Sequence, residues 1–184
     1  MRRIATSGLA AIAALLLVAF AAFVSYDMRV FQPRQAQIQA LLQRAPAEER
    51  VPPALIRRYI LATYATGASP SSSVARMLLG RLEVTREQSM LGWHTHEVLW
   101  DLLVRLHLSQ DEILGLYATL SYNGAGYGLS QLSQRLYAKP LSALSEPEAA
   151  TVVAVLWWPQ AYLRDRARLE RRRDLLMARA REAR

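Results

Sequence analysis

The distribution of apolar residues separates the start of the chain from the remainder. No charged residue lies between Arg3 and Asp27, and the stretch GLAAIAALLLVAFAAFV within this interval is almost entirely apolar. A helix of about 20 apolar residues is long enough to cross the roughly 30 Å hydrocarbon core of a bilayer. The pattern therefore predicts a transmembrane helix over residues 4–26, preceded by a short tail of residues 1–3.

The charges that flank this helix predict its orientation. Arg2 and Arg3 precede the apolar run, and the positive-inside rule then leaves the tail in the cytoplasm and the bulk of the chain outside it. A cleaved signal peptide is the alternative, because small residues at 19–21 (Ala-Phe-Ala) resemble a cleavage site, although the apolar run is longer than a usual signal core. In both cases we expect the chain beyond Asp27 to function on the far side of the cytoplasmic membrane, in the periplasm or on the outer surface.

Beyond residue 27 the apolar positions recur at helical spacing. They fall at i, i+3, i+4 and i+7 rather than at every second residue, which predicts helices and no strand. The sequence thus indicates an all-α fold. The positions are Ile38, Leu41 and Leu42, then Leu55, Tyr59 and Ala62, then Val98, Leu99, Leu102, Leu103 and Leu106.

Two helix starts carry a strong local signal. The stretches SQDE at 109–112 and SEPE at 145–148 are both capping boxes, in which a serine and a glutamate three residues later satisfy exposed backbone amides. They predict helices over Gln110–Leu120 and Glu146–Leu156.

Two polar stretches indicate the connections. APAEERVPP at 45–53 looks like a joint, so residues 27–53 are predicted to form a membrane-proximal helix and linker. TGASPSSS at 66–73 reads as a polar loop before a helix. The length of the remainder suits a single domain over residues 54–184.

Composition narrows the function classes. The chain has no cysteine and three histidines, which excludes disulfides and thiolate zinc sites and argues against a metal centre. The net charge is +8, with nine arginines against four acids in residues 164–184. Such a helix could meet anionic lipid or nucleic acid, but a solvated surface is the preferred interpretation because arginine is abundant throughout. No aromatic interleaving supports nucleic acid as a partner.

The segment from residue 108 to residue 159 resembles a known family. It reads LSQDEILGLYATLSYNGAGYGLSQLSQRLYAKPLSALSEPEAATVVAVLWWP and is similar to the C-terminal half of the family 51 peptidoglycan glycosyltransferases, in the monofunctional, membrane-anchored type. The matching residues are Asp111, Glu112, Ile113, Leu114, Leu116, Tyr117, Tyr122, Gly124, Gly126, Tyr127, Gly128, Tyr137, Lys139, Leu144, Glu148, Ala149 and Ala150.

The resemblance implies a fold, a substrate and a location. It implies a lysozyme-like helical domain on the outer face of the bacterial cytoplasmic membrane, polymerising glycan strands from lipid II. Cell-wall synthesis proteins are the implied partners. Lysine and arginine side chains, or a divalent cation, hold the substrate diphosphate in that family.

Further site residues follow from weaker matches upstream. Glu97 stands at the glutamate of the family's Arg-Lys-x-x-Glu motif, which here reads WHTHE, and is the candidate catalytic residue. The stretch GASPSSSVARML at 67–78 resembles a degraded serine- and threonine-rich family motif. It makes Ser69, Ser71 and Arg76 candidate substrate-binding residues, together with Lys139 from the C-terminal match.

The family's principal catalytic glutamate is missing. The family places it directly after an alanine at the end of a helix similar to ALIRRYILAT, whereas here Ala62 is followed by Thr63 and Tyr64. Residues 51–82 contain no acidic residue that could substitute as the base, and general-base catalysis is typically worth about 10²–10⁴-fold in rate.

Three functions remain open at this point. The chain could be a divergent glycosyltransferase in which Glu97 assists, or a non-catalytic module that binds lipid II, glycan or a partner protein. GYGLSQLS also faintly resembles a turn of lytic transglycosylases, but those enzymes need a glutamate after the same helix.

The glycine-rich stretch is predicted to be a structural turn. Tyr122, Gly124, Gly126, Tyr127 and Gly128 follow a capped helix, so the strand that a dinucleotide-binding loop requires is absent. We expect these glycines to allow a tight connection between two helices.

Overall fold

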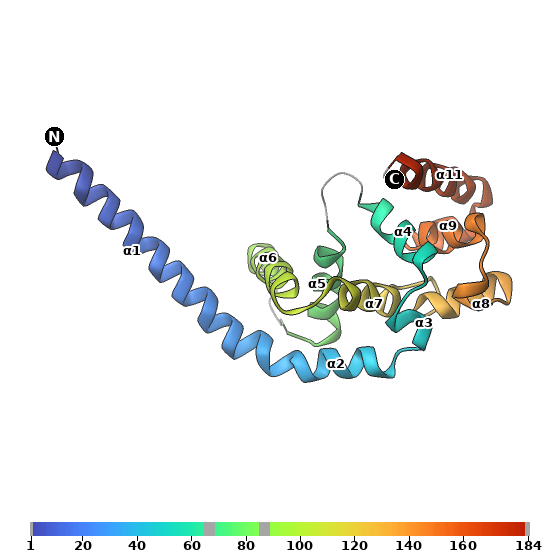
Figure 1. The fold of residues 1–184 in the computed structure, drawn as a ribbon, viewed down its shortest axis with the longest axis horizontal. Coiled ribbons are helices and arrows are strands. Elements are labelled where there is room, and N and C mark those ends of the chain that lie inside the picture. Colours follow the sequence, from blue (N-terminus) through green and yellow to red (C-terminus); the bar gives the residue numbers. More distant parts are fainter. Residues whose placement is uncertain (1, 65–68, 85–88, 183–184) are drawn as a thin grey trace. The chain divides into compact units, whose positions relative to one another are not determined.

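The structure, a computed structural model, describes residues 2–64, 69–84 and 89–182, and the side chains of its first helix from residue 12 onward. Within these residues it is helical and contains no strand, which confirms the all-α prediction (Figure 1). The beginning of the predicted polar loop, including Gly67, lies outside the described residues. The elements are α1 (Arg2–Tyr26), a π-helical turn (Asp27–Phe31), a 3₁₀ turn (Gln32–Arg34), α2 (Gln35–Arg44), α3 (Ala47–Arg50), α4 (Ala54–Thr63), α5 (Pro70–Arg81), α6 (Met90–His107), α7 (Gln110–Leu120), α8 (Leu129–Tyr137), a 3₁₀ turn (Leu141–Ala143), α9 (Glu146–Val155), α10 (Pro159–Arg164) and α11 (Arg166–Glu182).

The chain forms two compact units, the first ending at Gln37 and the second beginning at Ile38. The first unit is dominated by α1, whose side chains from Ile12 to Ala22 are exposed. The described residues include one helical run, Ile12–Arg44, that is long and apolar enough to cross a membrane. This confirms the predicted N-terminal apolar helix.

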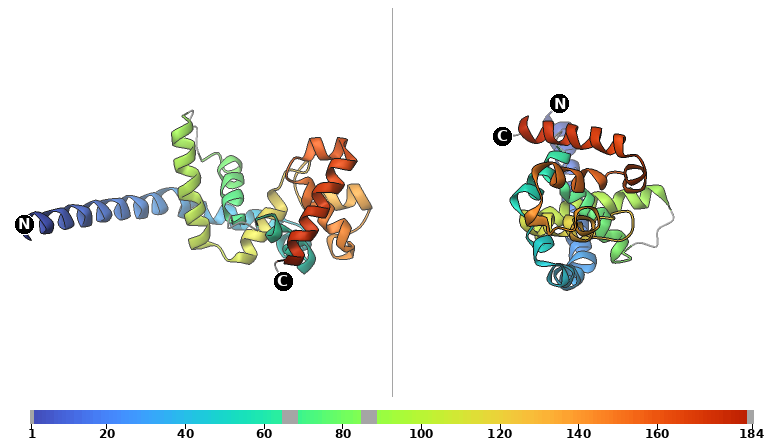
Figure 2. Two further views of the ribbon diagram at one scale, coloured as in Figure 1. Left: turned by 90° about the horizontal axis from the view of Figure 1, so that it is seen from above. Right: turned by 90° about the vertical axis from the view of Figure 1, so that its right-hand side faces the viewer.

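The second unit is built around α7. Helix α7 packs against α3 and α5, while α5 and α6 lie side by side as a pair (Figure 1). Helices α4, α9 and α11 pack against one another, with α8 beside α9. Figure 2 shows α11 running along the outside of this group. Side chains of α7 and α9 supply much of the core, including Leu114, Leu116 and Val152, which have no exposed surface.

Both predicted capping boxes are present. The backbone N–H of Ser109 donates to Glu112 Oε2 at 2.8 Å, and the backbone N–H of Ser145 donates to Glu148 Oε2 at 2.8 Å. The two helices span Gln110–Leu120 and Glu146–Val155. A local hydrogen-bonding signal therefore predicted both starts correctly, because capping depends on residues within one turn.

The polar loop predicted over residues 66–73 ends earlier than expected. Helix α5 already begins at Pro70, with Ser69 as its N-cap, so Ser71 and Ser73 are helical. Proline at the first helical position is favourable because its missing N–H would have no partner there. The start of α5 was mispredicted because a serine-rich stretch is compatible with both a loop and a helix cap.

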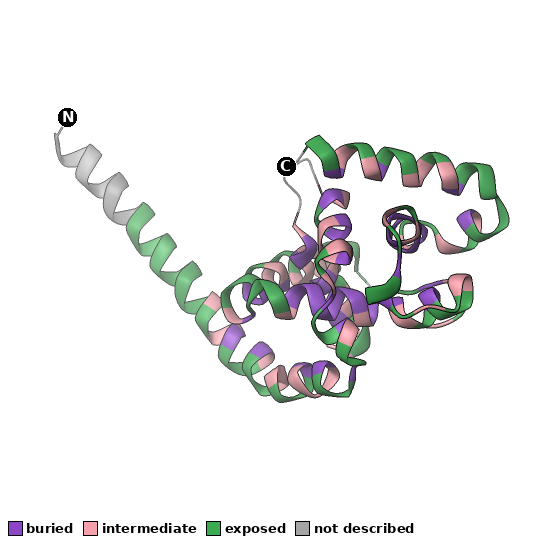
Figure 3. Cartoon of the chain, turned by 45° about the vertical axis from the view of Figure 1, so that its right-hand side comes forward, coloured by how far each residue is buried: buried purple, intermediate pink, exposed green. Residues whose placement is uncertain are grey.

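Helix α6 exposes part of its apolar pattern. Its buried residues are Trp100, Leu103 and Val104, while Val98 and Leu106 are 62% and 63% exposed. Figure 3 shows the same alternation of buried and exposed sides along the helices of the second unit. Helical spacing was thus predicted correctly, but the side that faces the core depends on the position of α5.

Candidate functional site

A cavity of about 310 Å³ lies at the C-terminal end of α4, where the catalytic glutamate was expected and is missing. Helices α4, α5, α7, α9 and α11 contribute to it, with the residues that follow α9. Its lining contains hydroxyl groups, aromatic rings and two guanidinium groups, and none of these residues carries a carboxylate. The lining residues are Thr63, Tyr64, Ser73, Arg76, Tyr117, Val153, Ala154, Leu156, Trp157, Arg172 and Leu176.

Tyr64 is one of the residues that line this cavity. Its hydroxyl lies 2.6 Å from Ser73 Oγ, and its ring meets that of Tyr117 edge to face at 6.0 Å. Burial raises the pKa of Tyr117 well above its ordinary value, and the neighbouring Tyr64 adds to this shift. Tyr117 therefore remains a neutral hydroxyl at physiological pH and cannot serve as a base.

Two arginines give the small cavity its positive charge. Arg172 from α11 lies over the ring of Trp157, with 4.8 Å from its guanidinium carbon to the ring centre. Its Nε is buried and has no hydrogen-bond partner within the described part of the chain. Arg76 contributes the second guanidinium from α5. Such forked donors suit phosphate oxygens.

Arg76 also binds Glu97, the predicted catalytic residue. Arg76 Nε donates to Glu97 Oε1 at 2.8 Å, and its Nη2 donates to the same oxygen. The His94 Nδ1 atom lies 3.6 Å from Glu97 Oε2. Glu97 therefore lines neither this cavity nor the larger one below, but it is bonded by Arg76, which lines both.

The two predicted serines stabilise the α5–α6 pair. Ser69 caps α5 by accepting from the backbone N–H of Ser71 at 3.2 Å. The buried Ser71 hydroxyl donates to Asp101 Oδ1 at 2.6 Å and accepts from Arg105 Nε at 2.8 Å. Neither serine lines one of the two cavities, so substrate binding by them stays a prediction.

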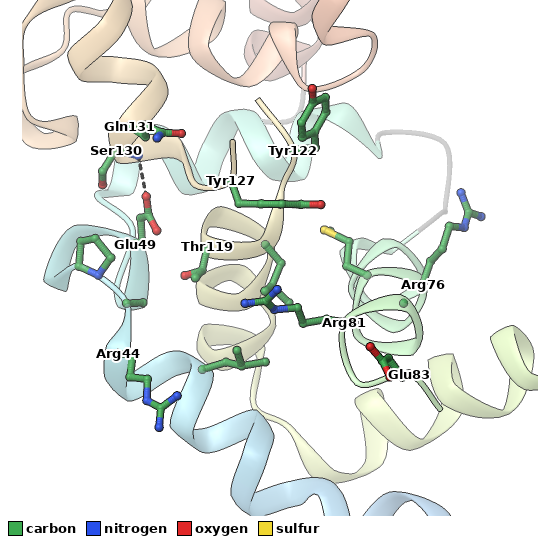
Figure 4. Close-up of a pocket in the computed structure, with 16 residues that line it drawn as sticks. Arg44, Glu49, Arg76, Arg81, Glu83, Thr119, Tyr122, Tyr127, Ser130 and Gln131 are labelled. Carbon is green, nitrogen blue, oxygen red and sulfur yellow. Dashed lines mark hydrogen bonds between the residues drawn. The ribbon is translucent and has the colours of Figure 1, made fainter. Parts of the chain in front are cut away.

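A second cavity, of about 880 Å³, is also lined by Arg76 (Figure 4). In Figure 4 Glu49 and Thr119 lie on one side of it and Arg76 on the other, with Tyr127 between them. Its size is within the range usual for ligand pockets. The lining residues are Leu41, Arg44, Ala45, Pro46, Glu49, Arg76, Met77, Gly80, Arg81, Glu83, Thr119, Leu120, Tyr122, Tyr127, Ser130 and Gln131.

The predicted glycine turn forms one wall of the larger cavity. Tyr122 and Tyr127 pair as an isolated antiparallel bridge, with their rings 5.7 Å apart in an edge-to-face arrangement. Gly124 and Gly128 have φ values of +93° and +94°, a backbone conformation that side chains disfavour. The turn thus depends on glycine at two positions.

Asn123 holds this turn together from inside. It is fully buried, and its Nδ2 donates to the carbonyl oxygen of Gly128 at 2.9 Å and to Gln131 Oε1 at 2.8 Å. Its Oδ1 accepts from the backbone N–H groups of Ala125 and Gly126. The side chain therefore replaces backbone hydrogen bonds that a tight turn lacks.

Glu49 is the buried carboxylate of the larger cavity. Only 3% of the residue is exposed, and its Oε1 accepts from the backbone N–H of Ser130 at 2.7 Å, at the start of α8. Burial raises the pKa of Glu49. Hydrogen bonds from Ser130 and Thr119 partly offset this increase. Gly128 permits this approach, because a Cβ there would lie 2.6 Å from Glu49 Oε1.

Lys139 lies apart from both cavities. Its Nζ donates to Glu148 Oε1 at 2.7 Å and to Oε2 at 3.0 Å, next to the capping box of α9. This contact, followed by the bonds from Ser145, lowers the pKa of Glu148 to about 2. The structure does not bring Lys139 together with Arg76, and a role in binding substrate stays a prediction.

The small cavity does not fit the divalent cation that the resemblance implies. Divalent cations prefer carboxylate oxygens, and its lining has none. Across the described ranges no group of three His, Cys, Asp or Glu side chains could hold a metal ion.

Comparison with known protein families identifies the family of this chain. A model of the transglycosylase family matches residues 49–181. The chain belongs to this family. The resemblance noted in the sequence is thereby confirmed, and the protein is peptidoglycan glycosyltransferase-like. No curated protein matches the chain.

Membership of the transglycosylase family indicates which group the small cavity lacks, namely a carboxylate. The resemblance noted in the sequence predicts the first catalytic glutamate at the end of the helix that corresponds to α4. Here Thr63 and Tyr64 stand at that point and line the cavity. Glu97, whose catalytic role stays a prediction, accepts a hydrogen bond from Arg76. The transglycosylase fold is thus present without a free carboxylate in the small cavity.

Sequence reasoning missed three residues of these sites. Arg172 was one of many arginines in a basic helix, and Trp157 followed an apolar run, so neither indicated a cavity. Glu49 lay in a segment interpreted as a linker. A buried position for Glu49 could not be found from spacing, because it depends on the approach of α3 to α8.

Proposed function

We propose that this protein is a membrane-anchored, non-catalytic member of the transglycosylase family that binds lipid II or nascent glycan. In this proposal the first helix is retained in the bacterial cytoplasmic membrane, and the second unit lies outside the cytoplasm. The single observation that supports it most is the composition of the small cavity, which holds Arg76 and Arg172 but no carboxylate.

Binding and polymerisation have different chemical needs. Guanidinium groups bind diphosphate through charge-assisted hydrogen bonds, and an exposed indole such as Trp157 gives a sugar ring an apolar surface. Polymerisation also requires a base that removes the proton from the attacking hydroxyl. The small cavity meets the first need and lacks the second.

Incubating the full-length protein in detergent with labelled lipid II separates these functions. We expect saturable binding and no glycan polymer. Arg172→Gln should weaken binding by about 10- to 100-fold, the equivalent of a lost charge-assisted hydrogen bond. Arg166→Gln is the matched control, because Arg166 is exposed on the same helix and pairs with Glu170. Polymer that disappears with Glu97→Gln would overturn the proposal.

Glycan polymerisation is the second candidate function, and Glu49 favours it. This buried carboxylate lines the larger cavity, and burial raises its pKa, which is the direction that favours a general base. The incubation with labelled lipid II described above also tests this function. Polymer formed by the wild type and lost with Glu49→Gln, but not with the exposed Glu83→Gln, would establish this function.

A further inference from the structure

Helix α11 carries its charges unevenly around its circumference. Its buried residues Leu169, Leu176 and Ala180 define the side that faces the unit. At 100° per residue, the other residues divide into two flanks. One flank holds Arg168, Arg171, Arg172, Leu175, Arg179 and Glu182, and the other holds Arg166, Glu170, Arg173, Asp174 and Arg181.

Two of the three acidic residues of the helix are paired with arginines on the second flank. Glu170 Oε1 accepts from Arg166 Nε at 3.0 Å, and Asp174 Oδ1 accepts from Arg173 Nε at 2.8 Å. Before the helix, Asp165 accepts from the backbone N–H of Arg168 as a cap. Glu182, in the last turn, is the one acidic residue of the first flank. The first flank therefore presents four arginines against one carboxylate.

Aromatic side chains adjoin this basic flank. The Arg168 guanidinium carbon lies 4.6 Å from the ring centre of Trp158 and 5.8 Å from that of Tyr162. Trp158 is 53% exposed, and Leu175 is 57% exposed. Tryptophan beside arginine, with an exposed apolar side chain, is typical of segments that lie at the boundary between membrane and water.

We propose that this basic flank, formed by Arg168, Arg171, Arg172, Leu175, Arg179 and Trp158, docks on a surface of anionic lipid headgroups. Guanidinium groups bind lipid phosphates, while the indole and Leu175 enter the headgroup layer. The flank suits nucleic acid less well, because single strands stack their bases on free aromatic faces. Arg168 already covers one face of Trp158.

The flank borders the small cavity through Arg172, which lines that cavity. Docking would bring the cavity to the level of the headgroups. The docking surface does not depend on the cavity's ligand, because a membrane surface alone provides the charge that the flank complements.

The absence of native cysteine makes a direct test possible. Leu175→Cys in the full-length protein carries one polarity-sensitive fluorophore, and the protein is reconstituted in discs of phosphatidylcholine with or without phosphatidylglycerol. We expect a blue shift and brighter emission only in the anionic discs, with a decrease as salt is raised. Each removed arginine should lower the ratio of docked to undocked protein about fivefold.

Two charge-reversal pairs provide matched controls. Arg168→Glu with Arg171→Glu should abolish the shift, whereas Arg166→Glu with Arg181→Glu, on the second flank, should preserve it. Circular dichroism of each variant checks that helix content is unchanged. The same labelled protein, kept in detergent and titrated with single-stranded RNA, tests nucleic acid as the alternative anionic partner.

Three outcomes would overturn the proposal: no response to anionic lipid, an equal loss with both reversal pairs, or a response to RNA alone. Lipid II binding in detergent, measured on the Arg168→Glu, Arg171→Glu protein, should be unchanged. Failure of docking is thereby distinguished from failure of the proposed ligand.

Discussion

The α7–α9 segment and the α5–α6 pair belong to the same unit but use polar side chains differently. In the first, buried Asn123 bonds backbone groups of the turn, and Glu148 completes a capping box. In the second, Arg76 and Glu97 bond mainly to each other, and the Arg76 side chain is 63% exposed. Asn123 and Glu148 thus satisfy backbone groups, whereas Arg76 and Glu97 join two side chains, of which that of Arg76 is open to water.

The family resemblance is strongest in the first region. The matching residues named above lie in α7–α9 and in the connections between these helices. The motifs that would carry chemistry lie in α4–α6, and there the acidic residue is absent and Glu97 is paired. The part of the chain that matches the family best is therefore not the part that carries the predicted catalytic motifs.

The largest expected effect concerns Asn123. Asn123→Ala removes a side chain that makes five hydrogen bonds, and should lower the free energy of unfolding by about 3 kcal/mol. Arg76→Ala in the other region should change it by about 0–1 kcal/mol, because the arginine is largely exposed. Chemical denaturation in mild detergent measures both. Equal losses would remove the distinction between the regions.

A second contrast uses one glycine from each region. A Cβ on Gly115 of α7 would lie 2.5 Å from the carbonyl oxygen of Arg50, so Gly115→Ala should destabilise the protein by about 2 kcal/mol. Gly80 of α5 has open space around it, and Gly80→Ala should stabilise the helix by about 0.5–1 kcal/mol. Thermal unfolding should shift in opposite directions. A gain with Gly115→Ala would show that α3 can move away from α7.

The smallest effect compares one carboxylate from each region. The Lys139 ammonium, and then Ser145, lower the pKa of Glu148 from 4.5 to about 2, so its charged form stabilises the fold. This contribution is complete above about pH 5 and is lost as pH falls toward 2.

Stability measured across this pH range tests the contribution. The difference between wild type and Glu148→Gln should shrink as pH falls from 5 to about 2. Glu97→Gln should change stability at pH 7 by about 0–1 kcal/mol, because its partner Arg76 is mostly exposed. A difference for Glu148 that does not vary with pH would contradict the assigned role of Lys139.

Much of the fold could be predicted from local patterns. The capping boxes predicted the starts of α7 and α9, and the apolar run predicted α1. The N-terminal start of α5 was misplaced, because a serine-rich stretch is compatible with both a loop and a cap. The candidate site was less predictable, since Arg172 and Glu49 come close to their partners only across long separations in the chain.

The sequence by itself determined the helical class, the apolar first helix, the family and the missing glutamate beside Ala62. Each of these depends on residue identity or on spacing within a few turns. Only the tertiary structure decided that Arg172 joins Arg76 at the cavity beside Thr63, that Glu49 is buried against α8, and that one flank of α11 is basic. These features depend on how helices pack, because packing decides which side of each helix is covered and which remains open to solvent.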